Sequence, residues 1–278
     1  MNRRVALAGV SGLLMAAMTL TACGQRTAEP GSTGAAAGSG EKVVKIGFVG
    51  PLSGGLSAMG AGMRNSVDLA IKQANESKAI PGWKIEILAE DDQASPDAGK
   101  NAATKLTGDP AVIAAVGPLN SSVGQAIQPI FQQAGVALVS PANTNPSLTK
   151  GADLANPKRA YSTYFRTCTT DDVQGPFAAK YLLDAGIKEA ATIHDKKAYG
   201  QGLVEAFTKA FTDGGGTIVA AETINPDDKD FSAVITKVKA ANPKAVYYGG
   251  EHPQSGPLSQ QAKNAGLNVP VMGGDGMF

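Results

Sequence analysis

Residues 112–139 read VIAAVGPLNSSVGQAIQPIFQQAGVALV, and this stretch decides the fold. It opens with an unbroken apolar run at 112–116, as expected of a parallel strand that is covered on both faces. A second apolar run follows at 136–139. Between the two, apolar residues recur at helical spacing at Val123, Ile127, Ile130 and Phe131. The order strand, helix, strand predicts two parallel strands joined by a right-handed crossover.

The same alternation continues in both directions. The segments expected as strands are 43–49, 83–88, 112–116, 136–139, 161–165, 190–194, 217–224, 245–248 and 269–272. The first intervening helix is expected to bury one face made of Met59, Met63, Val67, Ala70, Ile71 and Ala74. A loop at 140–158 interrupts the rhythm, and the break around 140–172 divides the strands into two groups. We therefore predict an α/β protein with two doubly wound parallel-sheet lobes, an N-terminal lobe at 42–165 and a C-terminal lobe at 166–278.

The beginning of the chain has the pattern of a secretory signal peptide. Arg3 and Arg4 precede an uncharged, apolar segment at 5–20. This segment runs into Leu-Thr-Ala-Cys at 20–23, a string similar to the bacterial lipobox, in which the cysteine is acylated. An ordinary signal with a chance cysteine gives the same string. We predict a signal peptide at residues 1–22.

A lipid anchor and a tether are expected to follow the signal. Acylation of Cys23 would place the mature protein on the membrane surface. Residues 23–41 are rich in Gly, Ala, Ser and Thr, so they cannot bury enough surface to fold and are expected to form a flexible tether. With Cys23 acylated, Cys168 is the remaining thiol, and a buried, inert side chain is its default interpretation.

Charge and motifs argue against several classes of protein. Lys and Arg number 25 against 24 Asp and Glu, a formal net charge of +1, whereas a nucleic-acid binder shows a basic excess. The sequence has no GxGxxG after the first strand, no GxxxxGK[ST] and no GxSxG. Its two histidines, His194 and His252, lie far apart, and no paired spacing suggests a metal. We expect a protein that is not an enzyme, with no cofactor, no metal and no nucleic-acid partner.

Two loops at expected strand ends are rich in hydroxyl and amide groups, and ligands of parallel sheets bind at such ends. Residues 117–122 read GPLNSS and lead from a strand into a helix. Backbone N–H groups at a helix start, with a serine hydroxyl, suit a carboxylate. Simple N-capping by Ser121 or Ser122 needs the same residues. Residues 140–146 read SPANTNP, which by itself indicates only a loop.

Several segments together resemble one family. They are SPANTNPSLT at 140–149, QGP at 174–176, AAKY at 178–181, HDK at 194–196, YGQGL at 199–203, KDFS at 229–232 and VYYGG at 246–250. In this order they are similar to the leucine/isoleucine/valine-binding proteins, the solute receptors of branched-chain amino-acid ABC transporters. The resemblance covers nearly the whole chain from residue 43. It implies the type I periplasmic-binding-protein fold, in which two lobes close on a ligand like a Venus flytrap.

The resemblance also implies an amino-acid site shared by both lobes. Ser121 stands where the family binds the ligand carboxylate through a backbone N–H and a hydroxyl. Ala142 stands where a backbone carbonyl accepts from the ammonium, and Thr144 where a threonine contacts both groups. Tyr199 matches a tyrosine on the second lobe's side of the cleft. Asp275 stands where an acidic residue faces the ammonium; a solvated turn residue is the alternative.

Four positions bear on which ligand the site takes. Met59 stands where the family commonly has an aromatic residue, and Glu251 where it has a tyrosine that reaches the ligand carboxylate. Asn120 occupies the region of a family disulfide cysteine, so we expect a polar amide beside the pocket. Asp171 is a further candidate for the pocket lining. A polar or cationic amino acid, an amide or another small zwitterion therefore stays open as the ligand.

The resemblance implies a transport function. We expect a monomeric receptor, lipid-anchored on the extracytoplasmic face of the cell envelope, that captures a branched-chain amino acid or related small zwitterion and delivers it to an ABC permease and its ATPase. A receptor or sensor module for an amide, urea or another small molecule is the alternative. Residues 166–172 are the expected hinge. Because family members continue beyond Phe278, we expect a sequence truncated at its C-terminus, with an incomplete second lobe.

Overall fold

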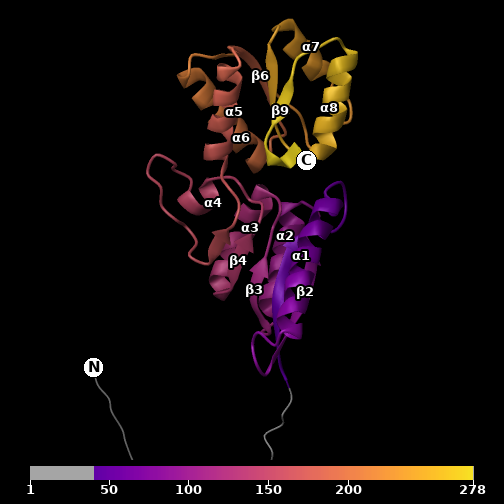
Figure 1. Ribbon diagram of the computed structural model, residues 1–278, viewed down its shortest axis with the longest axis vertical. Coiled ribbons are helices and arrows are strands. Elements are labelled where there is room, and N and C mark those ends of the chain that lie inside the picture. Colours follow the sequence, from indigo (N-terminus) through magenta and orange to yellow (C-terminus); the bar gives the residue numbers. More distant parts are fainter. Residues whose placement is uncertain (1–40, 278) are drawn as a thin grey trace, which may run out of the picture. The chain divides into compact units, whose positions relative to one another are not determined.

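The computed structural model describes residues 41–277 (Figure 1). Its strands are β1 (Lys42–Gly50), β2 (Trp83–Asp91), β3 (Val112–Val116), β4 (Ala137–Ser140), β5 (Tyr164–Arg166), β6 (Glu189–His194), β7 (Thr217–Thr223), β8 (Ala245–Gly249) and β9 (Val271–Gly273). Its helices are α1 (Ser57–Glu76), α2 (Pro96–Gly108), α3 (Ser121–Ala134), α4 (Ser147–Lys150), α5 (Asp171–Asp184), α6 (Ala198–Asp213), α7 (Ser232–Ala240), α8 (His252–Asn264) and the short 3₁₀ helix η1 (Asp275–Met277).

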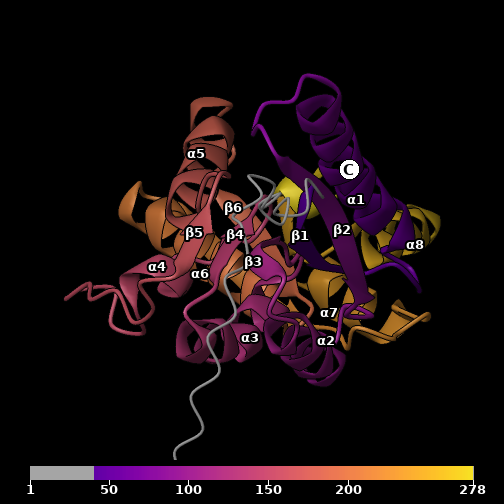
Figure 2. The ribbon, with the colours of Figure 1, turned by 90° about the horizontal axis from the view of Figure 1, so that it is seen from below.

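The strands form two parallel sheets, as the alternation of strands and helices predicted. One sheet has the order β2-β1-β3-β4-β5 and the other β7-β6-β8-β9, and every pairing is parallel. We call the part of the chain around the first sheet the first lobe and the part around the second sheet, with α5 to η1, the second lobe (Figure 1). In the first lobe, α2 and α3 cover one face of the sheet and α1 lies on the other (Figure 2).

The core of the first lobe lies under α2 and α3. Val123, Ile127 and Phe131 are fully buried, so the helical spacing in the opening stretch marks the face that packs on the sheet. The two helices approach closely because α2 presents small residues. A Cβ on Gly99 would lie 2.6 Å from Cγ1 of Val123, closer than real carbon contacts. This packing fixes the start of α3 at the end of the sheet.

The second lobe has two apolar cores, and one of them lies between α5, α6 and the sheet. The ring of Phe207 stacks on Tyr247 with centroids 3.9 Å apart, and on Phe211 at 5.2 Å. A Cβ on Gly175 would lie 2.6 Å from the backbone nitrogen of Phe207, so the backbones of α5 and α6 nearly touch. The opposite side of α5 is exposed and carries Val173, Phe177 and Tyr181.

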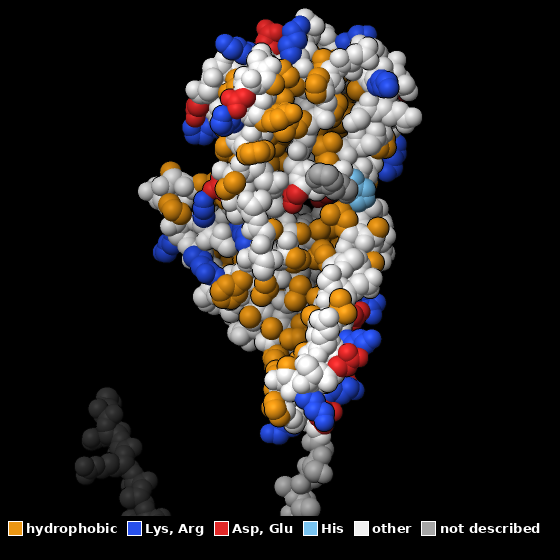
Figure 3. All heavy atoms as spheres, viewed as in Figure 1, with side chains coloured by type: hydrophobic (Ala, Val, Ile, Leu, Met, Phe, Trp, Pro, Cys, Tyr) orange, Lys and Arg blue, Asp and Glu red, His pale blue; other side chains and the backbone are white. Residues whose placement is uncertain are grey.

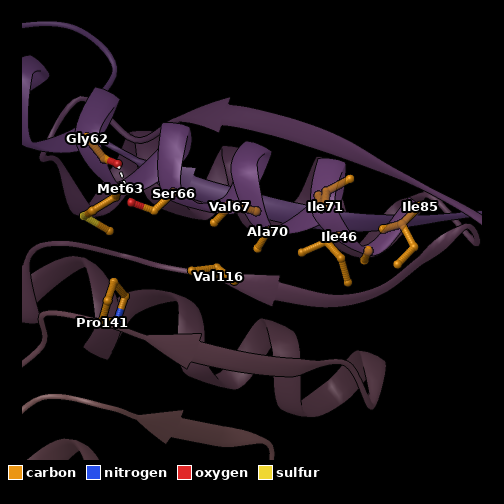
Figure 4. A pocket seen from close by; sticks show the side chains of 11 residues that line it. Ile46, Gly62, Met63, Ser66, Val67, Ala70, Ile71, Ile85, Val116 and Pro141 are labelled. Carbon is orange, nitrogen blue, oxygen red and sulfur yellow. Dashed lines mark hydrogen bonds between the residues drawn. The ribbon is translucent and has the colours of Figure 1, made fainter. Parts of the chain in front are cut away.

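The apolar face of α1 is not buried, and this corrects the sequence-based expectation. Met63 and Val67 are half-buried and Ala70 is exposed. These residues line an open groove of about 550 Å³ between α1 and the sheet (Figure 4). Figure 3 shows hydrophobic side chains on this face of both lobes. Helical spacing reports that a face is apolar, but it carries no information about what packs on it.

The loop after β4 is more ordered than its composition predicted. The expected loop at 140–158 contains the short helix α4, and the expected strand at 161–165 is β5, which begins only at Tyr164. Arg166 pairs with Ser140 in the first sheet, one residue beyond the lobe boundary given above. Its guanidinium donates to the carbonyl oxygens of Asn143 (2.6 Å) and Asn145 (2.9 Å), and this organises the loop.

The envelope features expected at the N-terminus fall outside the structure. The predicted signal peptide, Cys23 and the tether up to residue 40 lie outside the described residues. Within residues 41–277, no helix is long and apolar enough to cross a membrane.

Candidate functional site

A small cavity lies where strand ends of the two lobes meet. Its volume is about 40 Å³. The lining residues follow the carboxyl ends of strands or begin helices, and they are Met59, Leu119, Asn120, Ser121 and Ala142 from the first lobe and Tyr199, Glu251, Asp275 and Gly276 from the second. Parallel sheets place ligand sites at this end of their strands. The cavity is therefore the candidate site.

The first-lobe side is built by the start of α3. Asn120 is the N-cap residue, yet its side chain makes no capping hydrogen bond, and Ser121 is the first helical residue. A helix start without a side-chain cap offers backbone N–H groups and a positive dipole end to an anion. The preceding turn depends on Gly117, which has a φ of 125° and lies against the carbonyl oxygen of Val49.

The second-lobe side is built around the carboxylate of Asp275. The hydroxyl of Tyr199 and Nε2 of Gln174 both donate to Oδ1 of Asp275, at 2.9 Å and 3.1 Å. The backbone N–H of Gly276 donates to the Tyr199 hydroxyl at 3.0 Å. Burial, followed by the nearby Asp275, raises the pKa of Tyr199, so its phenol stays protonated and acts as a donor. These bonds orient an acid that is itself exposed.

A polar chain crosses the cavity between the lobes. Nδ2 of Asn120 in the first lobe donates to Oε1 of Glu251 in the second, at 2.6 Å. Nζ of Lys197 donates to Oε2 of Glu251 at 2.8 Å. Glu251 is only 5% exposed, so its charge requires a partner, and Lys197 supplies it. The acid at this position is thus balanced within the protein before any ligand arrives.

A second buried acid lies beside this chain. Asp195 is fully buried, and its Oδ1 accepts from the backbone N–H of Lys197 at 3.0 Å. Burial, with the neighbouring Glu251, raises the pKa of Asp195 to about 7. The Lys197 segment therefore lies between two carboxyl groups on the second-lobe side of the cavity.

Two residues named from the sequence do not line the cavity. The side chains of Thr144 and Asp171 are fully buried, and the backbone N–H of Asp171 donates to the carbonyl oxygen of Thr144 at 3.0 Å. Burial raises the pKa of Asp171 to about 7. This pair joins the loop after β4 to the first residue of α5, so it connects the lobes beside the cavity instead of forming its wall.

Four residues at the cavity were not foreseen. Leu119 and Gly276 line the cavity. Lys197 donates a hydrogen bond to Glu251, and Gln174 donates one to Asp275. Lys197 lies in the loop after β6, three residues beyond His194, so the rule that ligands bind at strand ends could have identified it. Gln174 offered no such signal, because its bond to Asp275 joins residues 101 positions apart.

Two further expectations from the sequence concern the thiol of Cys168 and the binding of metals. Cys168 is half-buried and free, and its Sγ donates to the carbonyl oxygen of Asn143 at 3.3 Å. Burial raises the pKa of this thiol, so it is a poor nucleophile. The part of the chain that the structure describes holds no group of three or more His, Cys, Asp or Glu able to bind a metal.

Comparison with known proteins defines the class. A family model described as periplasmic binding protein matches residues 43–278, and the chain belongs to this family. Its fold is the type I fold of that family, α/β with parallel sheets in two lobes. A crystal structure of a periplasmic binding protein type 1 from Bordetella pertussis has a TM-score of 0.77 at 25% identity, covering 85% of this chain and 63% of that one.

Particular relatives are named as branched-chain amino-acid binders. The Leu/Ile/Val-binding protein BraC3 of Rhizobium johnstonii is 37% identical over 84% of this chain and 62% of its own length. The leucine-, isoleucine-, valine-, threonine- and alanine-binding protein of Pseudomonas aeruginosa is 35% identical over 84% and 61%. LivJ of Streptococcus pneumoniae, solved with isoleucine, has a TM-score of 0.75 at 31% identity over 84% and 65%. These relatives are solute-binding proteins and not enzymes.

The match is partial in one respect. The chain spans about 62% of the length of the curated relatives it matches. The fold is also shared more widely than the amino-acid binders. A benzoate-bound solute-binding protein from R. palustris has a TM-score of 0.75 at 23% identity, over 85% of this chain and 63% of that one, a likeness of fold alone.

Proposed function

We propose that this protein is an extracytoplasmic receptor that captures an amino acid between its two lobes and delivers it to an ABC permease and its ATPase. One observation carries the proposal: an uncapped helix start and an oriented carboxylate line the same cavity from opposite lobes. An amino acid has an anionic and a cationic end, so it complements both walls together.

Each charged end of the ligand has its own binding groups in the protein. The α-carboxylate binds the backbone N–H and hydroxyl of Ser121 at the start of α3. The α-ammonium binds Asp275, with the backbone carbonyl of Ala142 as a second acceptor. Because these binding groups lie on different lobes, a bound ligand makes its full set of contacts only when the lobes are closed. It stabilises closure by the contacts that the open form lacks.

The ligand proposed is a branched-chain amino acid or a related small zwitterion. The relatives reported above are named for such ligands, and Met59 and Leu119 supply apolar surface in the cavity. The envelope location belongs to the same proposal: residues 1–22 are removed, Cys23 carries the lipid, and a monomer works at the membrane surface.

Calorimetry on the full chain with a panel of L-amino acids tests the proposal. We expect at least one to bind and to raise the unfolding temperature, since a ligand that prefers the folded state stabilises it. Asp275→Ala should weaken that binding by more than about 1 kcal/mol, about fivefold, the scale of a lost charged hydrogen bond.

The matched control is Asp184→Ala, which removes an exposed carboxylate of the second lobe paired only with Lys180. It should leave affinity unchanged. Absence of binding by any amino acid would contradict the proposed ligand class. Equal affinities of wild type and Asp275→Ala would remove Asp275 from the site.

A further inference from the structure

A buried amide oxygen beside the cavity has no partner. Asn120 is only 3% exposed, and its Oδ1 accepts no hydrogen bond among residues 41–277. We propose that Asn120 selects the ligand's side chain and favours an amino acid that carries a hydroxyl or amide donor over an apolar one of the same shape. This inference rests on the proposed function and names the ligand subclass of that site.

The orientation of the Asn120 amide is set by its neighbour. Glu251 accepts from Nδ2 at 2.6 Å, and an ionised carboxylate can only accept. A flipped amide would place Oδ1 against the carboxylate and leave Nδ2 without its acceptor. The amide is therefore oriented so that Oδ1 is the atom that lacks a hydrogen-bond donor.

Glu251 is itself held in place. Lys197 donates to its other oxygen at 2.8 Å, and the side chains of Lys197 and Glu251 are 21% and 7% exposed. A buried, charge-assisted pair of this kind is costly to break on one side. Lys197 holds Glu251, and Glu251 holds the amide of Asn120. These two hydrogen bonds therefore fix the orientation of a first-lobe side chain from the second lobe.

The usual task of an N-cap asparagine is not performed here. Asparagine at this position normally accepts from the first turn of the helix, but the Asn120 side chain makes no such bond. Its oxygen is therefore free for another donor. Because the amide bonds to the opposite lobe, the closed arrangement of the lobes and not the helix start determines where the oxygen lies.

The size of the cavity brings the ligand's side chain to this amide. The cavity measures about 40 Å³, whereas a cavity of about 150 Å³ accommodates benzene. An amino acid is larger than this cavity, so it binds only when the lobes move slightly apart, and it then contacts most of the narrow lining, which includes Asn120, Met59 and Leu119. A side chain with one methyl and one donor, such as that of threonine, matches both the apolar and the polar parts of this lining.

An apolar side chain at this place leaves the oxygen covered and unpaired. A site built around an unpaired polar group discriminates against ligands that lack the matching group, because the protein atom loses water and gains nothing. We expect threonine to bind at least tenfold more tightly than valine, which has a methyl group in place of the hydroxyl. Asparagine should likewise exceed leucine.

Calorimetry on the full chain tests this preference by comparing the affinity for threonine with that for valine, and the affinity for asparagine with that for leucine. In Asn120→Leu, which keeps the approximate shape and removes the acceptor, the threonine preference should fall below threefold. The matched control is Asn101→Leu, which removes an exposed amide on α2 and should leave the preference at its wild-type value.

Two results separate this inference from the proposed function. Valine and leucine binding as tightly as threonine and asparagine overturns the role of Asn120 and leaves the amino-acid receptor standing. Binding of no amino acid overturns both. If Asn120→Leu fails to fold, Glu251→Gln decides: a glutamine can donate as well as accept, so the amide is no longer fixed and the preference should shrink. An undiminished preference in Glu251→Gln overturns the inference.

Discussion

Tyr199 combines packing in the second lobe with hydrogen bonds at the cavity. Its side chain is 6% exposed and belongs to the core formed with Leu203 and Phe207. Its hydroxyl donates to Asp275 and accepts from the N–H of Gly276. One residue thus anchors η1 to α6 and sets the direction of the carboxylate. The ring and the hydroxyl can be separated by experiment.

Tyr199→Phe keeps the ring and removes the hydroxyl. We expect the fold to persist and the amino-acid affinity to fall about fivefold, because one hydrogen bond that orients the acid contributes about 1 kcal/mol. Calorimetry measures the affinity, and Tyr181→Phe on the exposed side of α5 is the control. Wild-type affinity in Tyr199→Phe would show that Asp275 needs no such orientation.

Asp92 shows how a buried acid affects stability away from the cavity. It is fully buried, its Oδ1 accepts from the N–H of Ala94 at 2.9 Å, and its Oδ2 has no partner among the described residues. Burial raises the pKa of Asp92 from 3.8 to about 7. The folded state therefore binds this proton more tightly than the unfolded state, and stability falls as the pH rises from about 4 to about 7.

The corresponding prediction concerns Asp92→Asn. At pH 8 the wild type holds a buried charge and the variant does not, so the variant should be more stable there by about 1 kcal/mol or more. At pH 4 the two should be nearly equal, because the aspartate is then protonated. Urea unfolding at both pH values measures this, and a variant less stable than wild type at pH 8 contradicts the assignment.

At the scale of elements, the turn between β3 and α3 positions the first-lobe side of the cavity. Gly117 adopts a φ of 125°, and a Cβ there would lie 1.8 Å from the carbonyl oxygen of Val49 on β1. The close approach of these two strand ends places Asn120 and Ser121 at the cavity. A side chain at Gly117 must displace the turn.

Gly117→Ala should therefore lower both stability and binding. We expect a loss of more than about 2 kcal/mol of unfolding free energy, since backbone strain and a backbone clash act together. The control is Gly108→Ala at the end of α2, where a Cβ meets nothing within 4 Å. Chemical denaturation compares the two, and equal stabilities would contradict the role given to Gly117.

The positions of the strands and helices were largely predictable from the sequence. Which of their faces are buried by other elements was not. Apolar runs such as 112–116, and the alternation of strands with helices, predicted each of the nine strands within residues 41–277, with β5 placed three residues early. The apolar face of α1 was equally visible in sequence, but burial depends on a partner element, which periodicity does not report. Its actual surroundings, an open groove, follow from the packing of the whole lobe.

For the candidate site, strand-end loops and the family resemblance indicated seven of the lining residues. The pairing inside the site was not predictable. Asn120 and Glu251 are 131 positions apart, and Lys197 is 54 from Glu251. The first pair forms only when the two lobes meet, and the second because β6 and β8 are neighbours in one sheet, so local sequence pattern does not report either pair. The partners that neutralise Glu251, an acid where the family has a tyrosine, could therefore not be identified from the sequence.

At the scale of the whole molecule, contacts between the lobes surround the cavity. Besides the bond from Asn120 to Glu251, Nδ2 of Asn145 donates to the carbonyl oxygen of Ala198 at the start of α6, at 2.6 Å. In this arrangement the cavity of about 40 Å³ is too small for a leucine-sized ligand. Under the proposed function, a ligand therefore enters when these contacts open, and it stabilises the arrangement in which it contacts both lobes.

We propose that an amino acid bridges the lobes from the start of α3 to Asp275. A crystal structure of the full chain, grown with the amino acid that binds most tightly, tests it most directly. We expect the ligand carboxylate within hydrogen-bonding distance of the Ser121 N–H and its ammonium beside Asp275. A ligand bound elsewhere, or one whose ammonium lies away from Asp275, would contradict this binding mode.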